Sequence, residues 1–251
     1  MTARPAARPL SGQVALITGA TRGIGRAIAV RLAQEGTAVC ITGRNAERGA
    51  EVVAEINAAG GRCHFLPLDV VDYAAVRRAV ADTAAHFGGF DIAIANAGIG
   101  SIGYVADSDP ADWRAMMDVN FHGTANLVRA ALEPLLAQGF GSIMAIGSVA
   151  GIRGWPEWAG YCASKHAVVG FMECLGQEMV NRNIRVAMVS PGSVDTGFWD
   201  DLNQDIARSG SDAREVMMTA ADVAELVILQ LKLPQTVVIK NAVTFPTSEW
   251  H

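Results

Sequence analysis

A tyrosine and a lysine four positions apart, Tyr161 and Lys165, are the residues of this sequence best placed to do chemistry. They open a long helical pattern, and residues four apart lie on one face of a helix. A free tyrosine has a pKa of about 10, and a neighbouring ammonium moves that pKa towards neutrality. Ser148, thirteen positions earlier, has a hydroxyl that can donate to a developing alkoxide oxygen. Each residue alone has an ordinary structural explanation, but the three together indicate acid–base chemistry at an oxygen.

A glycine-rich turn follows the first apolar run of the chain. It reads Thr18-Gly19-Ala20-Thr21-Arg22-Gly23-Ile24-Gly25 and leads into a helical pattern. Glycines there permit a tight turn and let the backbone approach a pyrophosphate, while the helix N-terminus offers free N–H groups to that phosphate. The turn alone is a weak signal, but its place after a first strand favours a dinucleotide site.

These residues must be positioned by a regular alternation of apolar, strand-length runs and helical patterns. Strands that are apolar at nearly every position are buried on both faces, which implies a parallel sheet covered by helices. The alternation predicts an α/β fold, a single Rossmann-like doubly wound sheet of about seven strands with helices on both faces. The predicted strands are 14–18, 39–42, 62–66, 91–95, 142–146, 184–190 and 236–239, and the predicted helices are 23–34, 46–58, 73–86, 112–136, 159–181 and 221–231.

The domain organisation follows from the same pattern. Residues 1–10 are expected to be a flexible tail and residues 11–251 one domain. Residues 197–219 fit the alternation poorly and are predicted to form an excursion above the sheet. Ligands of doubly wound sheets bind beyond the carboxyl ends of the strands, so this excursion is well placed to cover a substrate.

Composition excludes several classes of function. The 251 residues carry a formal net charge of −5, with no block of Lys or Arg, so a nucleic-acid partner is not expected. The four cysteines show no C-x-x-C spacing, and no histidine has ligand partners at metal-site spacing, so no metal is expected. Residues 134–152 lack charge but are broken by Pro and Gly, and the N-terminus has no signal-peptide core. A soluble, cytoplasmic protein without a membrane partner is the expectation.

In order along the chain, the T-G-x-x-x-G-I-G turn, Ser148 and Tyr-x-x-x-Lys resemble the short-chain dehydrogenase/reductase family. The resemblance covers the chain from Gly12 to about Ile239 and implies hydride transfer between a nicotinamide cofactor and a small-molecule ketone or secondary alcohol. Asn120, in Asp118-Val119-Asn120, matches a fourth catalytic member that organises a water of the proton relay. The implied cofactor contacts are Gly19, Thr21, Arg22, Gly23, Ile24, Gly25, Arg44, Asp69, Val70, Asn96, Ala97, Gly98, Tyr161, Lys165, Pro191, Gly192, Val194 and Thr196.

The charge after the second strand discriminates between the two nicotinamide cofactors. NAD binders usually place Asp or Glu there to hold the ribose 2′-OH. The segment 36–46 contains no acid, and Gly43 stands where the family's NAD-type acid would lie. Arg44, with Arg22 as a second cation, can instead bind a 2′-phosphate. The sequence therefore predicts NADP(H), and an NAD-dependent alcohol dehydrogenase of the same family is the alternative.

The substrate is less well defined by the sequence. Ile152, Trp155 and Trp158 precede Tyr161 and predict an apolar or aromatic pocket wall, with Phe198 and Trp199 closing it. The D-G-G ending of the family's acyl-carrier-protein reductases is missing, so fatty-acid synthesis is not favoured. A dinucleotide sensor without catalysis would show damage at the catalytic positions, and none is damaged. The resemblance also implies a homo-oligomer, a tetramer or dimer, formed through the two long helices.

Overall fold

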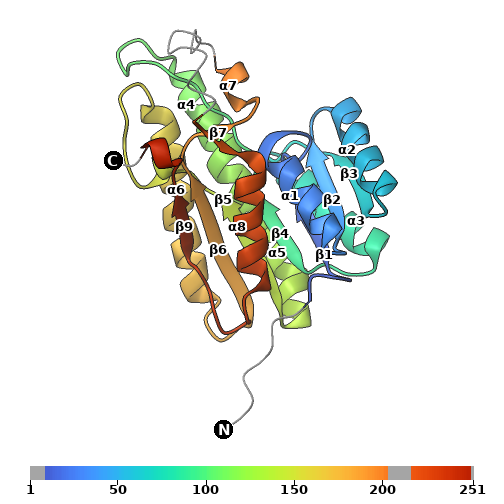
Figure 1. Cartoon of the computed structure of the whole chain (residues 1–251). Helices are drawn as coiled ribbons and strands as arrows, with labels where there is room; N and C mark the ends of the chain where they lie inside the picture. The colour runs from blue at the N-terminus through green and yellow to red at the C-terminus, as the bar shows by residue number, and fades with distance from the viewer. Residues whose placement is uncertain (1–8, 203–215, 250–251) are drawn as a thin grey trace.

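Seven parallel strands form the centre of the molecule (Figure 1). The computed structural model describes residues 9–202 and 216–249 of the chain. The strand order is β3-β2-β1-β4-β5-β6-β9. Strands β2 and β3 therefore lie on one side of β1, and the later strands, from β4 on, lie on its other side. This confirms the predicted doubly wound, Rossmann-like domain. The strands are β1 (Val14–Ile17), β2 (Ala38–Gly43), β3 (Arg62–Pro67), β4 (Ile92–Ala95), β5 (Gly141–Ile146), β6 (Ile184–Pro191) and β9 (Asn241–Thr244).

Helices cover both faces of the sheet because neighbouring strand residues point to opposite sides. Leu16 and Ile17 of β1 are both fully buried, yet they belong to two different hydrophobic clusters. One cluster contains residues of α1 (Gly23–Gln34), α2 (Ala46–Ala58) and α8 (Ala220–Lys232). The other contains residues of α3 (Tyr73–Phe87), α5 (Gly123–Gln138) and α6 (Ala159–Glu178). The apolar runs of the sequence thus become strands that are buried on both faces.

Local signals fix where several helices begin and end. Asn45 Oδ1 accepts from Arg48 N at 2.9 Å at the start of α2, and Asp72 Oδ1 accepts from Ala75 N at 3.0 Å at the start of α3. Gly88 ends α3 with a left-handed φ of 81°. By contrast, Arg22, the N-cap residue of α1, makes no side-chain capping hydrogen bond. The first N–H groups of α1 are therefore open to a ligand.

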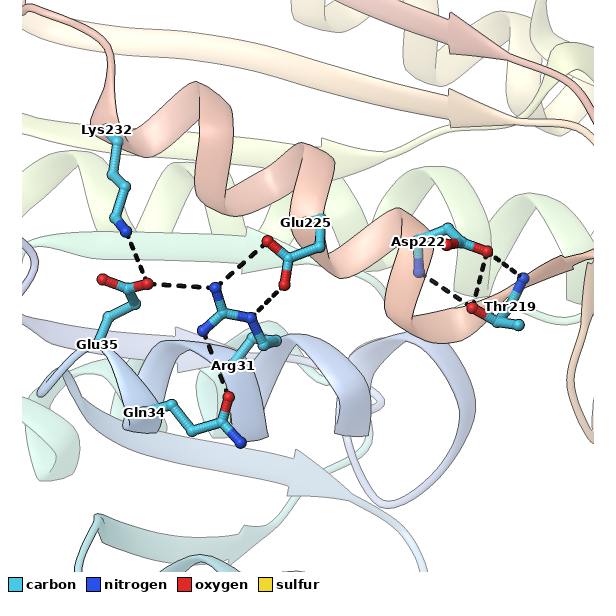
Figure 2. A network of polar contacts seen from close by, with 7 residues as sticks. All are labelled: Arg31, Gln34, Glu35, Thr219, Asp222, Glu225 and Lys232. Atoms are coloured by element: carbon cyan, nitrogen blue, oxygen red, sulfur yellow. Dashed lines mark hydrogen bonds and ion pairs between the residues drawn. The ribbon is translucent and has the colours of Figure 1, made fainter.

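A network of ion pairs joins α1 to α8 on the surface (Figure 2). Arg31 of α1 pairs with Glu225 of α8 and, at 3.2 Å, with Glu35 just after α1. Lys232 Nζ, from the last turn of α8, lies 2.6 Å from the same Glu35 carboxylate. The two helices pack side by side, so the network connects the beginning of the chain with its end.

The last predicted strand was wrong in position. Residues 236–239 lie in the connection after α8, where Val237 N donates to Pro234 O at 2.8 Å. The seventh strand is β9, whose Asn241 pairs with Met188 of β6. The run 236–239 is rich in β-branched residues, but the chain needs these residues to travel from the end of α8 to the sheet edge.

The long helix predicted over 112–136 is divided into three segments. A short α4 (Pro110–Met116) is followed by a π-helical segment, Met117–His122, and then by α5. Gly123 begins α5 close to Val70, because a β-carbon at Gly123 would lie 2.6 Å from Val70 Cγ2. The π segment therefore lies where the helix passes close to the loop after β3.

The predicted excursion over 197–219 is only partly described. Its first part contains α7 (Phe198–Asp201), and β7 (Val194–Asp195) pairs with β8 (Met218–Thr219) outside the main sheet. Residues 203–215 lie outside the described residues, as do residues 1–8 of the predicted tail. Leu10, at the end of that tail, is buried.

No helix in 9–202 or 216–249 has both the length and the apolar character that crossing a membrane requires.

Candidate active site

A cavity of about 650 Å³ lies at the carboxyl ends of the central strands. It is lined by the glycine turn, by the loops that follow β2 to β6, and by α7. Every predicted catalytic or cofactor-binding residue lines this cavity except Gly25 and Asn120. The structure therefore gathers the predicted phosphate end and the predicted catalytic end into one continuous space.

The glycine turn is held against the turn after β4. Gly19 has a φ of 64°, and a β-carbon there would lie 2.7 Å from Ala97 Cα. A β-carbon on Gly25 would lie 2.4 Å from Asn96 Nδ2. That Nδ2 donates to Thr18 O at 2.9 Å and to Gly19 O at 3.0 Å. Gly25 thus serves the packing of the turn, and Asn96 uses its side chain to fix the backbone of the turn.

Thr18 is a positioning residue that the sequence reasoning missed. Its Oγ1 accepts from Asn96 N at 3.1 Å and from Ala97 N at 3.2 Å. These bonds hold the Asn-Ala-Gly turn directly after Ala95, the last residue of β4. No sequence signal identified them, because the partners are 78 and 79 positions apart.

The phosphate end of the cavity suits a dinucleotide. Gly23 and Ile24, in the first turn of the uncapped α1, line the cavity, so free N–H groups and the positive end of the helix dipole lie beside it. Gly43 contributes no side chain at the end of β2, and a β-carbon there would lie 2.7 Å from Thr21 Cγ2. Because Gly19, Gly23 and Gly43 have no side chains, this end of the cavity has room for a phosphate-bearing ligand.

Arginines gather around the same end. Arg22 and Arg44 line the cavity. The pKa of Arg22 is lowered, first by burial and then by repulsion from Arg48 and Arg44. Arg48, in the first turn of α2, was not predicted, because only the fold brings that turn next to the glycine turn. Arg22 also pairs with Asp201 of α7, so its guanidinium is shared between the phosphate end and the substrate end.

Three of the residues predicted to be catalytic, Ser148, Tyr161 and Lys165, line this cavity. Ser148 begins a short 3₁₀ turn after β5, and Tyr161 lies in the first turn of α6. Lys165 follows one turn later, with its Nζ 5.8 Å from the centre of the Tyr161 ring. The same Nζ donates to Ile146 O at 3.1 Å, and the lysine is only 5% exposed.

The electrostatics of this group differ from the expectation. Burial raises the pKa of Tyr161 to about 12, although its hydrogen bond with Ser148 acts in the opposite direction. Burial lowers the pKa of Lys165 to about 8. The lysine was expected to lower the pKa of the phenol. Its ammonium lies beside the ring and donates to a backbone carbonyl, and loss of hydration has the larger effect on the phenol.

Asn120 lies behind the cavity wall in the π-helical segment. Its Oδ1 accepts from Ile99 N at 2.8 Å, and its Nδ2 donates to Ile99 O and to Ser164 Oγ, both at 2.9 Å. Ser164 Oγ in turn donates to Tyr161 O at 2.7 Å. A β-carbon on Gly98 would lie 3.3 Å from Asn120 Oδ1 and 3.7 Å from Lys165 Nζ, so the two side chains are neighbours. Ser164 is a second positioning residue that the sequence did not reveal.

The substrate end is lined by aromatic residues. Trp155, Trp158, Phe198 and Trp199 all line the cavity near Tyr161. Ile152, which was also expected in this wall, is 47% exposed and lies outside it. The short 3₁₀ turn after Ser148 directs Ile152 to the surface.

Within 9–202 and 216–249 no three metal-ligating side chains lie together as a metal site.

Sheet order, glycine turn and cavity define a dinucleotide-binding α/β protein of the Rossmann type. Residues 13–207 match the family model described as short chain dehydrogenase. The chain belongs to this family of oxidoreductases, whose members use a nicotinamide dinucleotide.

Curated relatives and solved structures agree with this membership. A 3beta-hydroxysteroid dehydrogenase of Mediterraneibacter gnavus is 38% identical over 195 residues, which are 77% of this chain and 70% of the relative. A 3-oxoacyl-[acyl-carrier-protein] reductase of Staphylococcus aureus is 32% identical over 236 residues, 94% of this chain and 90% of the relative. The closed form of a serine dehydrogenase complexed with NADP+ superposes with a TM-score of 0.89 at 30% identity, covering 95% and 97% of the two chains.

Proposed function

We propose that this protein is an NADP(H)-dependent reductase that interconverts a ketone and a secondary alcohol of a small organic molecule. The observation that carries the proposal is the single cavity that contains Ser148, Tyr161 and Lys165 together with the uncapped start of α1. A proton donor for an oxygen and a cradle for a phosphate-bearing cofactor are the two parts that hydride transfer to a carbonyl needs.

The cofactor would lie along the glycine turn. The first turn of α1 would hold the pyrophosphate, and Asp69 and Val70 would line the adenine site. Val194 and Thr196 would hold the nicotinamide end. Arg44, together with the nearby Arg22 and Arg48, favours a 2′-phosphate over a bare ribose hydroxyl. The serine dehydrogenase complexed with NADP+ and an alcohol dehydrogenase of Thermococcus sibiricus complexed with 5-hydroxy-NADP are consistent with this choice.

The bound dinucleotide would supply the hydride, and the side chains of the protein would manage the oxygen and its proton. Ser148 would donate a hydrogen bond to the carbonyl oxygen as negative charge develops there. Tyr161 would donate its Oη proton to that oxygen. Lys165 would stabilise the phenolate that remains and hold the ribose hydroxyls, and Asn120 would order the relay that returns the proton.

At neutral pH both groups carry the proton that the reducing direction needs. A phenol whose pKa is raised to about 12 is fully protonated at neutral pH and is ready to act as a proton donor. A lysine with a pKa of about 8 is charged at pH 7, beside the phenolate that the reaction forms. Both groups are then in the protonation states that reduction of a carbonyl requires.

Cofactor titration combined with a catalytic variant tests the proposal. NADPH and NADH are titrated separately, and oxidation of each is followed at 340 nm with a panel of ketones. We expect tighter binding of NADPH, and in Tyr161→Phe we expect unchanged NADPH affinity with a roughly 10²–10⁴-fold lower turnover. Tyr73→Phe, on the surface at the start of α3, is the control. Equal affinity for NADH would overturn the cofactor assignment, and an active Tyr161→Phe enzyme would overturn the role of the phenol.

A further inference from the structure

Four aromatic rings form a closed cycle that includes the reactive phenol. The ring centre of Tyr161 lies 5.4 Å from that of Trp158 and 5.7 Å from that of Phe198. Trp199 closes the cycle at 6.0 Å from both Trp158 and Phe198. Three of the four contacts are edge-to-face, an arrangement favoured by the charge distribution of aromatic rings. All four rings line the cavity, so a substrate bound beside Tyr161 would lie next to aromatic side chains.

The rings of α7 are held in place by contacts outside the cycle. Trp199 Nε1 donates to Val194 O at 2.8 Å. Phe198 lies against Gly100, where a β-carbon would be 2.6 Å from the ring atom Cζ. A glycine at this position lets the ring approach the loop after β4. Because both rings have fixed partners, they present defined surfaces to a substrate.

Charged groups at this end of the cavity already have partners among the described residues. Asp201 pairs with Arg22, and Glu249 Oε2 lies 3.4 Å from Ser193 N. The Arg153 guanidinium lies over the Trp155 ring, 5.4 Å from its centre. A charged substituent that displaced these contacts would lose hydration and break an existing interaction. The described walls consequently favour an uncharged substituent.

We propose that this site takes an uncharged ketone or secondary alcohol that carries a flat ring one or two bonds from the reacting carbon. Trp158, Phe198 and Trp199 are its specificity-determining residues. The inference rests on the proposed function and names the substrate class of the same site. In the balanced step, hydride from the reduced dinucleotide forms the new C–H bond. The C=O π bond breaks, and the oxygen takes the Tyr161 proton, giving the alcohol and the oxidised dinucleotide.

Two methyl ketones of nine carbons separate ring recognition from simple hydrophobicity. Phenylacetone and 2-nonanone have the same number of carbons, and neither carbonyl is conjugated. We measure kcat/KM for both with saturating NADPH in wild type, Phe198→Leu and Trp199→Leu, which stay apolar but lose a ring. Tyr73→Leu, an aromatic loss outside the cavity, is the matched control. Circular dichroism confirms that each variant is folded. The charged analogue (4-carboxyphenyl)acetone and a 3-oxoacyl thioester complete the panel.

Wild type is expected to prefer phenylacetone over 2-nonanone by about tenfold or more, and each ring loss is expected to reduce that ratio about three- to tenfold. Tyr73→Leu should leave the ratio unchanged, and the carboxylated ketone should be at least tenfold poorer than phenylacetone. A preference for 2-nonanone or the thioester, or a ratio unchanged in both ring variants, would overturn the inference while leaving the reductase assignment intact. If no ketone is reduced with either cofactor, the proposed function itself fails.

Discussion

Replacing Lys165 with methionine should make the protein more stable while removing most of its activity. The ammonium is buried without a carboxylate partner, and its one hydrogen bond in the described structure goes to Ile146 O. Methionine keeps most of the apolar stem but carries no charge that must be dehydrated. Sites built for chemistry commonly cost stability in this way.

The size of the effect follows from the pKa. A fall from 10.5 to about 8 corresponds to about 3 kcal/mol of unfavourable free energy for the charged form in the fold. Loss of the hydrogen bond to Ile146 O removes about 1–2 kcal/mol of stabilisation. The net gain is about 1–2 kcal/mol at pH 7, roughly 2–8 °C in melting temperature for a domain of this size.

The sign of the pH dependence is specific to this lysine. The pKa of Lys165 in the folded protein lies below its value in the unfolded chain. The free-energy cost of burying the charged amine therefore applies in full below pH 8, where the lysine is protonated in both states. The cost disappears by pH 10.5, where the unfolded chain also loses the proton. The advantage of Lys165→Met over wild type should therefore shrink steadily from pH 8 to pH 10.5.

Denaturant unfolding without cofactor, at pH 7, 8, 9 and 10, measures this difference directly. Using the difference between two proteins cancels the titration of the buried thiols Cys40 and Cys63, whose pKa values are also shifted. Lys232→Met is the control, because its amine is half exposed and pairs with Glu35. A Lys165→Met protein that is no more stable than wild type at pH 7, or whose advantage persists at pH 10, would refute the reasoning.

Three further predictions concern the cofactor, acid and the glycine turn. Arg44→Ala should weaken NADPH binding about 10–100-fold and leave NADH binding unchanged in fluorescence titrations, with Arg26→Ala, whose guanidinium pairs with a glutamate of α2, as control. The pKa of Glu35 is lowered by the hydrogen bond from a lysine of α8. The ionised carboxylate therefore stabilises the fold by at most about 1 kcal/mol, and this stabilisation should be lost as pH falls below about 4.5. Glu35→Gln should accordingly narrow the difference in melting temperature between pH 6 and pH 3.5, and an undiminished difference would contradict this. In Gly25→Ala the new β-carbon, 2.4 Å from Asn96 Nδ2, should destabilise the fold by about 1–3 kcal/mol and abolish NADPH binding, as calorimetry can check.

The sequence predicted the sheet well because its strands carry the signal in their own residues. The runs that became β1, β2, β4 and β5 are buried and almost wholly without charge, and both faces of the sheet are covered. The error at 236–239 arose because β-branched residues favour strands, whereas the position of β9 depends on where α8 ends. The π-helical segment escaped prediction for a similar reason, since the approach of Gly123 to Val70 is a tertiary contact.

At the candidate site, the sequence predicted residues that belong to motifs and missed those that position them. Tyr161 and Lys165 are recognisable from their spacing alone, and the structure places them in one cavity. Thr18, Ser164 and Arg48 act through partners far away in the sequence, so no local pattern identifies them. The raised pKa of Tyr161 was equally hidden, because burial is a property of the fold and not of a spacing.

The contact between α1 and α8 has a consequence for how the chain folds. Arg31 and Glu225 are separated by 194 positions, and the apolar side of α1 shares its cluster with Val223 and Val227. During synthesis, that side of α1 has no helix to cover it until nearly the whole polypeptide has left the ribosome. Long-range closure of this kind slows folding and leaves apolar surface open to aggregation or to chaperones. Helix α1 is thus synthesised early, but its packing is completed only when α8 has been made.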